Sequence, residues 1–92
     1  MASVSLTFIG KPDCHLCEDA RVVVRGVLDD LAADSSVSAP EVTVTELSIL
    51  DNPALMDEFA EEIPVVMIDG RVHTIWRVDP ARLRRALLEA SE

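Results

Sequence analysis

One stretch near the N-terminus decides the fold: residues 4–17 read VSLTFIGKPDCHLC. Its first half alternates apolar and small polar residues over 4–9, which is the pattern of a half-buried strand. The glycine and proline within 10–13 indicate a loop. From Cys14 onward, apolar residues recur at three- and four-residue steps, which predicts a helix to about Ala33. The expected inward stripe of this helix is Leu16, Ala20, Val23, Val24, Val27, Leu28 and Leu31.

The middle of the chain predicts a loop, a second strand and a short helix. Residues 34–40 are small and polar, and 42–47 are rich in β-formers. Asn52-Pro53 is typical of a helix start, with a capping side chain followed by proline at the first position. This helix must end before Ile63-Pro64, because the residue before a proline avoids helical angles. Its buried stripe is expected to be Leu55, Met56 and Phe59.

The C-terminal third predicts a hairpin and a last helix. Residues 65–68 are apolar on both faces, as a central strand should be. Asp69-Gly70 is a strong two-residue hairpin signal, and 72–76 form the expected returning strand. Asp79-Pro80 begins the last helix. Its expected inward residues are Leu83, Leu87 and Ala90, and its expected solvated residues are Arg82, Arg84 and Arg85.

The predicted order of elements is β-α-β-α-β-β-α, within a single domain over residues 1–92. The first three elements form a βαβ unit, so the first two strands should be parallel with a right-handed crossover. The last two strands should form an antiparallel hairpin. Together these elements predict an α/β fold with one mixed four-stranded sheet covered by helices.

The composition limits the possible partners. The 92 residues are 49% hydrophobic, which suits one small domain with a core rather than a disordered acidic chain. Lys and Arg number 8 against 17 for Asp and Glu, so nucleic acid and anionic membrane surfaces are not expected partners. The longest apolar run, 65–68, is far too short to span a membrane, and the N-terminus lacks a signal-peptide pattern. A cytoplasmic protein is therefore expected, and the single lysine among the basic residues indicates a GC-rich bacterial source.

The two cysteines, Cys14 and Cys17, stand where the first strand gives way to the first helix. A cysteine at a helix N-terminus meets unpaired backbone N–H groups and the positive end of the helix dipole, which favour the nucleophilic thiolate. Three residues later, on the same helix face, Cys17 can reach back to Cys14. This arrangement suits thiol–disulfide exchange, in which Cys14 attacks a disulfide and Cys17 resolves the mixed disulfide.

Other interpretations of the cysteine pair stay open. Two thiolates supply half of a tetrahedral metal or iron–sulfur site, which dimerisation or His73 would have to complete. Alternatively, the cysteines are small apolar residues of a non-catalytic binding module. His15, between them, either stabilises the Cys14 thiolate when protonated or is an exposed linker residue.

The segment 10–17, followed by Ile63-Pro64 before a strand, resembles the glutaredoxins of the thioredoxin fold, and especially the small glutaredoxin-like bacterial proteins. The resemblance covers essentially the whole chain. It implies that Cys14 is the nucleophile and Cys17 the resolving cysteine. It also implies that the protein is a thiol–disulfide oxidoreductase that acts on a disulfide-containing protein or small thiol, as a monomer and without a bound cofactor or metal.

The same resemblance assigns substrate-binding residues. Lys11 matches a lysine that contacts a carboxylate of glutathione. Pro64 matches a cis-proline that faces the active site, and Ile63 would offer its backbone N–H and C=O to a bound peptide or glutathione. Asp79 is the match for a polar cap on the γ-glutamyl end of glutathione. With His15, these are the expected binding residues.

The chain departs from the glutaredoxin pattern at three places. His15-Leu16 replaces Pro-Tyr between the cysteines, and Glu62 stands two residues before the proline in place of threonine. Residues 75–79 read IWRVD, where glutaredoxins carry a Gly-Gly turn. The reductant is therefore left open between glutathione and another low-molecular-weight thiol.

Overall fold

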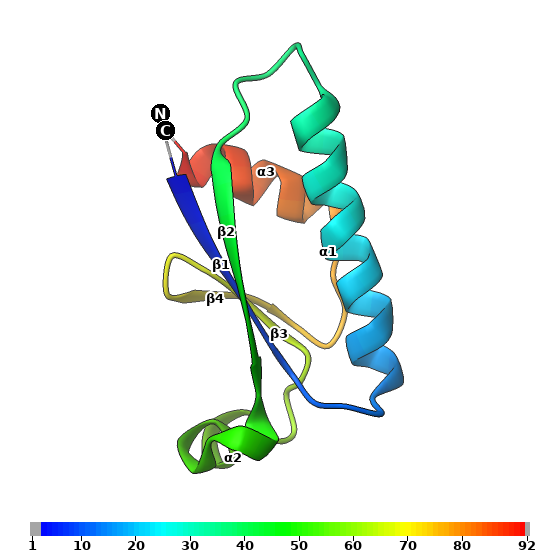
Figure 1. The fold of residues 1–92 in the computed structure, drawn as a ribbon, viewed down its shortest axis with the longest axis vertical. Helices are drawn as coiled ribbons and strands as arrows, with labels where there is room; N and C mark the ends of the chain where they lie inside the picture. The colour runs from blue at the N-terminus through cyan, green and yellow to red at the C-terminus, as the bar shows by residue number, and fades with distance from the viewer. Residues whose placement is uncertain (1–2, 92) are drawn as a thin grey trace.

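Four strands build the central sheet of the computed structural model, which describes residues 3–91 (Figure 1). They are β1 (Ser3–Gly10), β2 (Glu41–Ser48), β3 (Val65–Ile68) and β4 (Arg71–Ile75), and their order in the sheet is β2-β1-β3-β4. β2 runs parallel to β1, whereas β3 is antiparallel to both β1 and β4. The expected α/β fold with a mixed four-stranded sheet is confirmed.

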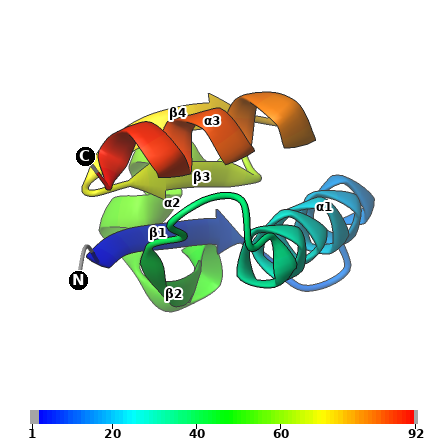
Figure 2. The same cartoon turned by 90° about the horizontal axis from the view of Figure 1, so that it is seen from above.

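Three α-helices surround the sheet: α1 (His15–Ala33), α2 (Pro53–Phe59) and α3 (Pro80–Ala90), with a 3-10 turn over Ile49–Asp51 before α2. Each helix begins at a side chain that accepts a hydrogen bond from a backbone N–H of its first turn, namely Cys14, Asn52 and Asp79. α1 and α3 pack against each other (Figure 2), whereas α2 lies beyond the end of β2 (Figure 1). No helix within residues 3–91 combines the length and apolar character needed to cross a membrane.

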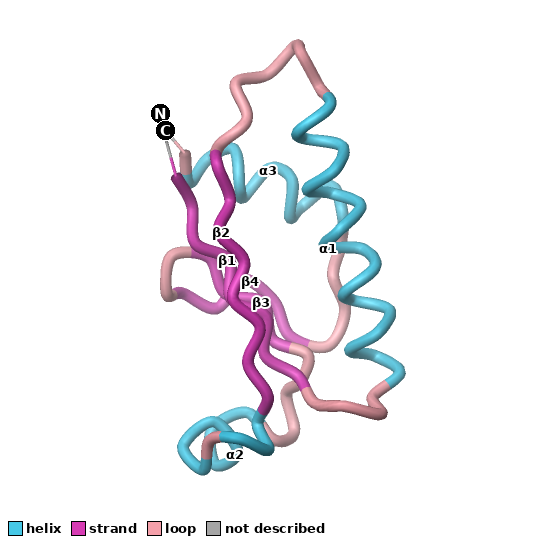
Figure 3. Tube along the Cα trace, in the orientation of Figure 1, coloured by secondary structure: helices cyan, strands magenta, loops and turns pink. Residues whose placement is uncertain are grey.

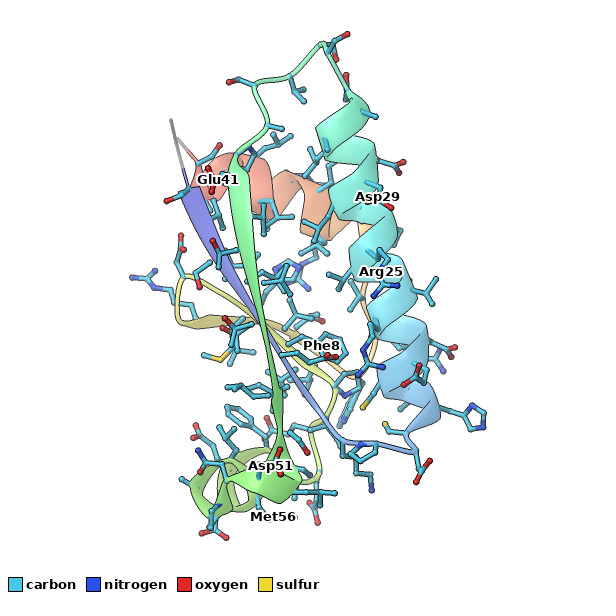
Figure 4. The ribbon with its side chains drawn as sticks, in the orientation of Figure 1. Phe8, Arg25, Asp29, Glu41, Asp51 and Met56 are labelled. Atoms are coloured by element: carbon cyan, nitrogen blue, oxygen red, sulfur yellow. The ribbon has the colours of Figure 1, made fainter. Side chains whose placement is uncertain are left out.

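Core residues lie on both faces of the sheet: Ile9 and Val65 are buried on one face, and the larger group lies on the other, against the helices α1 and α3. Val4, Leu6 and Phe8 of β1 are buried on this face, whereas Ser5 on the opposite face is exposed. Figure 4 shows Phe8 pointing from β1 toward α1, where the Arg21 guanidinium carbon lies 5.2 Å from the centre of its ring. The buried helix residues are Cys17, Ala20, Val24, Val27 and Leu31 in α1, and Leu83 and Leu87 in α3.

Three expectations about single side chains are wrong. Leu16 and Met56 are expected on buried stripes, but 38% and 36% of their surfaces are exposed. α2 buries only Phe59, and Met56 faces outward at the end of the molecule (Figure 4). Trp76 is expected to end the returning strand, but pairing with β3 stops at Ile75 and Trp76 adopts a positive φ of 67°. Leu16 and Trp76 thus remain half in water, close to the start of α1.

Arg82 and Arg85 of α3 are exposed as expected, and only Arg84 is less solvated than expected. Arg84 is half-buried and donates a hydrogen bond of 2.7 Å to Asp34, the residue that ends α1. Hydrogen bonds from Ser36 and from Arg84 lower the pKa of Asp34 to about 2. Arg82 donates to the backbone C=O of His73 at 3.1 Å. These contacts tie α3 to the end of α1 and to β4.

The glycines at the hairpin and in α1 should respond to alanine in opposite directions. Gly70 has φ 82°, which alanine adopts only with strain, whereas Gly26 lies inside α1 with nothing within 4 Å of an added Cβ. Gly70→Ala should lower the free energy of unfolding by about 1–2 kcal/mol, and Gly26→Ala should raise it by about 0.5–1 kcal/mol. Urea denaturation of the two variants checks this, and shifts of the same sign would contradict it.

Candidate functional site

Cys14 caps the N-terminus of α1 with its own sulfur. Its backbone is extended, with φ −118° and ψ 113°, and its Sγ accepts a hydrogen bond of 3.2 Å from the Cys17 N–H. Its C=O accepts the first helical bond, from the Glu18 N–H, at 3.0 Å. The sulfur occupies the place that serine or aspartate oxygens usually take at helix starts, where donors and the helix dipole favour a negative charge. The Cys14 sulfur is thus fixed at the first turn of α1 and is partly accessible to solvent.

Cys17 is the buried partner of this pair. None of its surface is exposed, and burial, together with a hydrogen bond to Cys14, raises its pKa to about 11. Both cysteines are free thiols in the structure. At neutral pH the inner cysteine is thus a protonated thiol behind an accessible outer sulfur, which is the division of roles expected for a nucleophile and its resolving group.

Gly10, at the end of β1, makes room for the inner sulfur. A Cβ at this position would lie 3.0 Å from Cys17 Sγ and 3.3 Å from a ring carbon of Phe8. The backbone of the next residue, Lys11, hydrogen-bonds the Cys17 thiol and opposes part of the pKa increase. The sequence predicted Gly10 only as loop punctuation; the close approach of helix to strand gives it a role in the site.

The peptide bond Ile63-Pro64 is cis, as the resemblance implies. Antiparallel pairing of Ile9 with Val65 sets Pro64 beside Gly10, and so next to the glycine that Cys17 touches. Pro64 is buried, and its C=O accepts a hydrogen bond of 2.8 Å from the Trp76 N–H. Ile63 takes no part in the backbone hydrogen bonds of the turns and loops within residues 3–91, and the residue itself is buried, so a contact of its N–H and C=O with a bound chain stays a prediction.

The other expected binding residues differ in their surroundings. Lys11 and His15 are exposed and flank Cys14, so both can meet a substrate there. The Asp79 carboxylate accepts a hydrogen bond of 3.1 Å from the Arg82 N–H. Asp79 therefore has a structural role, as the N-cap of α3. A contact between Asp79 and substrate stays a prediction.

Within residues 3–91, no three His, Cys, Asp or Glu side chains gather in a way that could hold a metal ion. His73, the residue named to complete a half-site, lies on β4. Its Nε2 is buried without a hydrogen-bond partner among the described residues, and burial and the nearby Arg82 lower its pKa.

The segment that follows β4 passes along α1 near the cysteines (Figure 3). Its Trp76 is held by two hydrogen bonds, from its N–H to Pro64 and from its indole N–H to the C=O of Glu61 at 3.0 Å. Trp76–Val78 forms one wall of a groove, and α1 residues from Leu16 to Val23 form the other. The sequence pattern assigned Trp76 to the returning strand. Its position beside α1 became visible only from its hydrogen bonds to Pro64 and Glu61 in the structure.

Replacing Gly10 should disturb both stability and the cysteine pair. The added methyl of Gly10→Ala forces the Cys17 sulfur or the strand to shift, which should cost about 1–3 kcal/mol of unfolding free energy. It should also slow closure of the Cys14–Cys17 disulfide, measured by quenched alkylation after oxidation. Gly26→Ala is the matched control, since it adds the same methyl far from the site. Wild-type stability and closure rate in Gly10→Ala would contradict this role.

Comparison with known proteins agrees with this geometry. The chain matches the glutaredoxin-like domain (DUF836) over residues 5–88. It is 31% identical over 84 residues to an uncharacterized protein of Mycobacterium tuberculosis, covering 91% of this chain and 82% of that protein. It is 24% identical over 81 residues to a glutaredoxin-like protein of Dictyostelium discoideum, covering 88% of this chain and 72% of that one.

Solved structures share the fold. A structural-genomics target protein from X. campestris is 29% identical, with a TM-score of 0.57 over 95% of this chain and 99% of that one. Oxidized mitochondrial thioredoxin 3 of Saccharomyces cerevisiae gives a TM-score of 0.61 at 11% identity, over 94% of this chain and 77% of that one. The latter likeness concerns the fold alone. By its sequence and its thioredoxin fold, the chain belongs to the glutaredoxin-like domain family (DUF836).

Proposed function

We propose that this protein is a glutaredoxin-like thiol–disulfide oxidoreductase that works through the dithiol of Cys14 and Cys17. The observation that carries the proposal is the hydrogen bond from the Cys17 N–H to Cys14 Sγ, with the buried Cys17 thiol behind it. One sulfur is thereby held at the accessible start of α1, and the second lies buried behind it. A structural cysteine pair would not need this asymmetry.

The first step is attack of the Cys14 thiolate on one sulfur of the substrate disulfide. The substrate S–S bond breaks, its first sulfur leaves as a thiolate, and a mixed disulfide joins the second sulfur to Cys14. In this proposal, the backbone N–H and C=O of Ile63 bind an extended segment of substrate. The ammonium group of Lys11 and the exposed imidazole of His15 flank Cys14 in the sequence and can donate hydrogen bonds to an anionic substrate or leaving group.

The second step releases the reduced substrate. The Cys17 thiol gives up its proton to the thiolate that left in the first step, and its sulfur attacks Cys14 Sγ. The Cys14–Cys17 disulfide forms, the second substrate thiolate leaves, and two electrons have passed from the cysteine pair to the substrate. The raised pKa of Cys17 keeps this sulfur from reacting before the mixed disulfide exists.

Reduction of the Cys14–Cys17 disulfide completes the cycle. Two equivalents of a low-molecular-weight thiol, of which glutathione is one candidate, or one dithiol reductase would supply the electrons. A reducing compartment such as the cytoplasm fits this need, and no bound cofactor or second subunit enters the proposed steps.

The two thiols should differ in their reaction with iodoacetamide. Because the pKa of Cys17 is raised to about 11, roughly one molecule in ten thousand carries its thiolate at pH 7. Native reduced protein should therefore be alkylated at Cys14 alone near neutral pH, with Cys17 reacting only as the pH approaches 11. Peptide mass spectrometry after timed quenching measures both rates. Equal rates at pH 7 would contradict the assigned roles.

Turnover tests the proposed function itself. Wild-type protein should reduce a protein disulfide when coupled either to glutathione with glutathione reductase or to a thioredoxin-type reductase. Cys14→Ser should abolish turnover, because no nucleophile remains, and Cys17→Ser should accumulate the mixed disulfide at Cys14. The proposal fails if neither coupling supports turnover, or if Cys14→Ser leaves the rate unchanged.

A further inference from the structure

Two exposed apolar side chains face each other across the groove beside the cysteines. Leu16 is 38% exposed and Trp76 is 52% exposed, and both line the groove between α1 and the segment after β4. Ala20, Val23 and Val78 complete its apolar lining. Single exposed apolar side chains are common on protein surfaces, but here two of them line one groove that begins within the cysteine motif.

Trp76 is fixed in this position rather than loosely exposed. Its backbone N–H bonds Pro64, its indole N–H bonds the Glu61 C=O, and its φ of 67° is unusual for a bulky residue. An outlying backbone angle that is maintained by specific contacts is a feature of binding sites. The structure therefore holds a rigid aromatic wall beside Pro64.

The opposite wall begins inside the cysteine motif. Leu16 stands between Cys14 and Cys17, so the groove starts within two residues of the attacking sulfur. A substrate whose cysteine is bonded to Cys14 would place its neighbouring residue at or near the groove. In an extended chain both neighbours of that cysteine point to the face opposite its side chain, so the substrate chain must turn at the cysteine for a neighbour to enter the groove.

The charges at the rim balance one another. The groove carries one acid, Asp19, and one base, Arg77, so it offers no net attraction to a charged side chain. Its walls offer apolar and aromatic contact. The chemistry that fits this surface is a bulky apolar side chain.

We infer that this groove binds a bulky apolar residue next to the disulfide-bonded cysteine of a polypeptide, so that the preferred substrates are protein disulfides with apolar flanks. This inference rests on the proposed function, since it names the substrate class of the same site. It makes Trp76 and Leu16 specificity-determining residues, which contact the substrate without taking part in the exchange of bonds.

The test uses two matched mixed disulfides of a short peptide with thionitrobenzoate, a coloured leaving group. The peptides differ only in the residue next to cysteine, which is leucine in one and serine in the other. Attack by Cys14 at the peptide sulfur forms the peptide–Cys14 disulfide, releases thionitrobenzoate and is followed by stopped-flow absorbance, so no reductant is needed. Wild-type protein should react about five- to tenfold faster with the leucine peptide.

Variants of each wall locate the source of this preference. Trp76→Ala should bring the ratio close to one, and Leu16→Ser should reduce it from the other side of the groove. Trp76→Phe keeps an aromatic ring without the indole N–H and should retain most of the preference if it folds normally by circular dichroism. Val72→Ala is the control, because Val72 is equally exposed, at 52%, but lies on β4 outside the groove.

Each outcome decides a different claim. Similar rates for both peptides with wild-type protein would overturn the inferred substrate class and leave the redox function standing. A preference that survives both Trp76→Ala and Leu16→Ser would equally overturn the assignment of the groove. If neither peptide released thionitrobenzoate, the proposed function and the inference would be overturned together.

Discussion

The hydrogen bond from the Cys17 N–H to Cys14 Sγ is the interaction on which the site depends. It places a sulfur where a helix start would otherwise need an oxygen cap, so formation of α1 also fixes the position of the Cys14 sulfur. The same turn carries Cys17 inward, against Gly10 at the end of β1. A side chain larger than hydrogen at Gly10 would separate strand and helix at the point where the second sulfur must sit.

The sheet brings the remaining parts of the site to this point. Antiparallel pairing of β1 with β3 sets Pro64 beside Gly10. The Trp76 N–H in turn donates a hydrogen bond to the Pro64 C=O, which holds the segment after β4 next to Pro64. Three stretches that are distant in sequence therefore meet at the N-terminal end of α1. If these stretches were flexible loops, binding of a substrate would have to order them, at a cost in binding free energy. Here strand pairing orders them before any substrate binds.

Much of this arrangement follows from the sequence, because local rules govern it. Alternation, capping side chains and the Asp69-Gly70 turn indicated every strand and α-helix to within a few residues. The cysteine spacing at a helix start indicated that Cys14 and Cys17 would lie together at the N-terminus of the first helix. Pattern rules reach these features because each depends on neighbours within a few residues along the chain.

The parts that escaped prediction depend on contacts between distant segments. The role of Gly10 comes from the close approach of α1, and the direction of Trp76 comes from bonds to Glu61 and Pro64. Leu16 lies on the apolar period of α1 yet stays exposed, because it lines the groove beside the segment after β4 instead of reaching the core. Periodicity identifies the apolar residues of a helix, but only packing decides which of them reach the core.

The reduction potential of the Cys14–Cys17 couple tests the central claim most directly. Equilibration of the protein with glutathione buffers of graded potential, followed by acid quenching and mass spectrometry, measures the fraction of intramolecular disulfide. A reversible two-electron transition between about −180 and −270 mV is expected, the range of glutaredoxins, thioredoxin and related dithiol catalysts. If no Cys14–Cys17 disulfide forms anywhere in this range, the account of the pair as a working redox centre is contradicted.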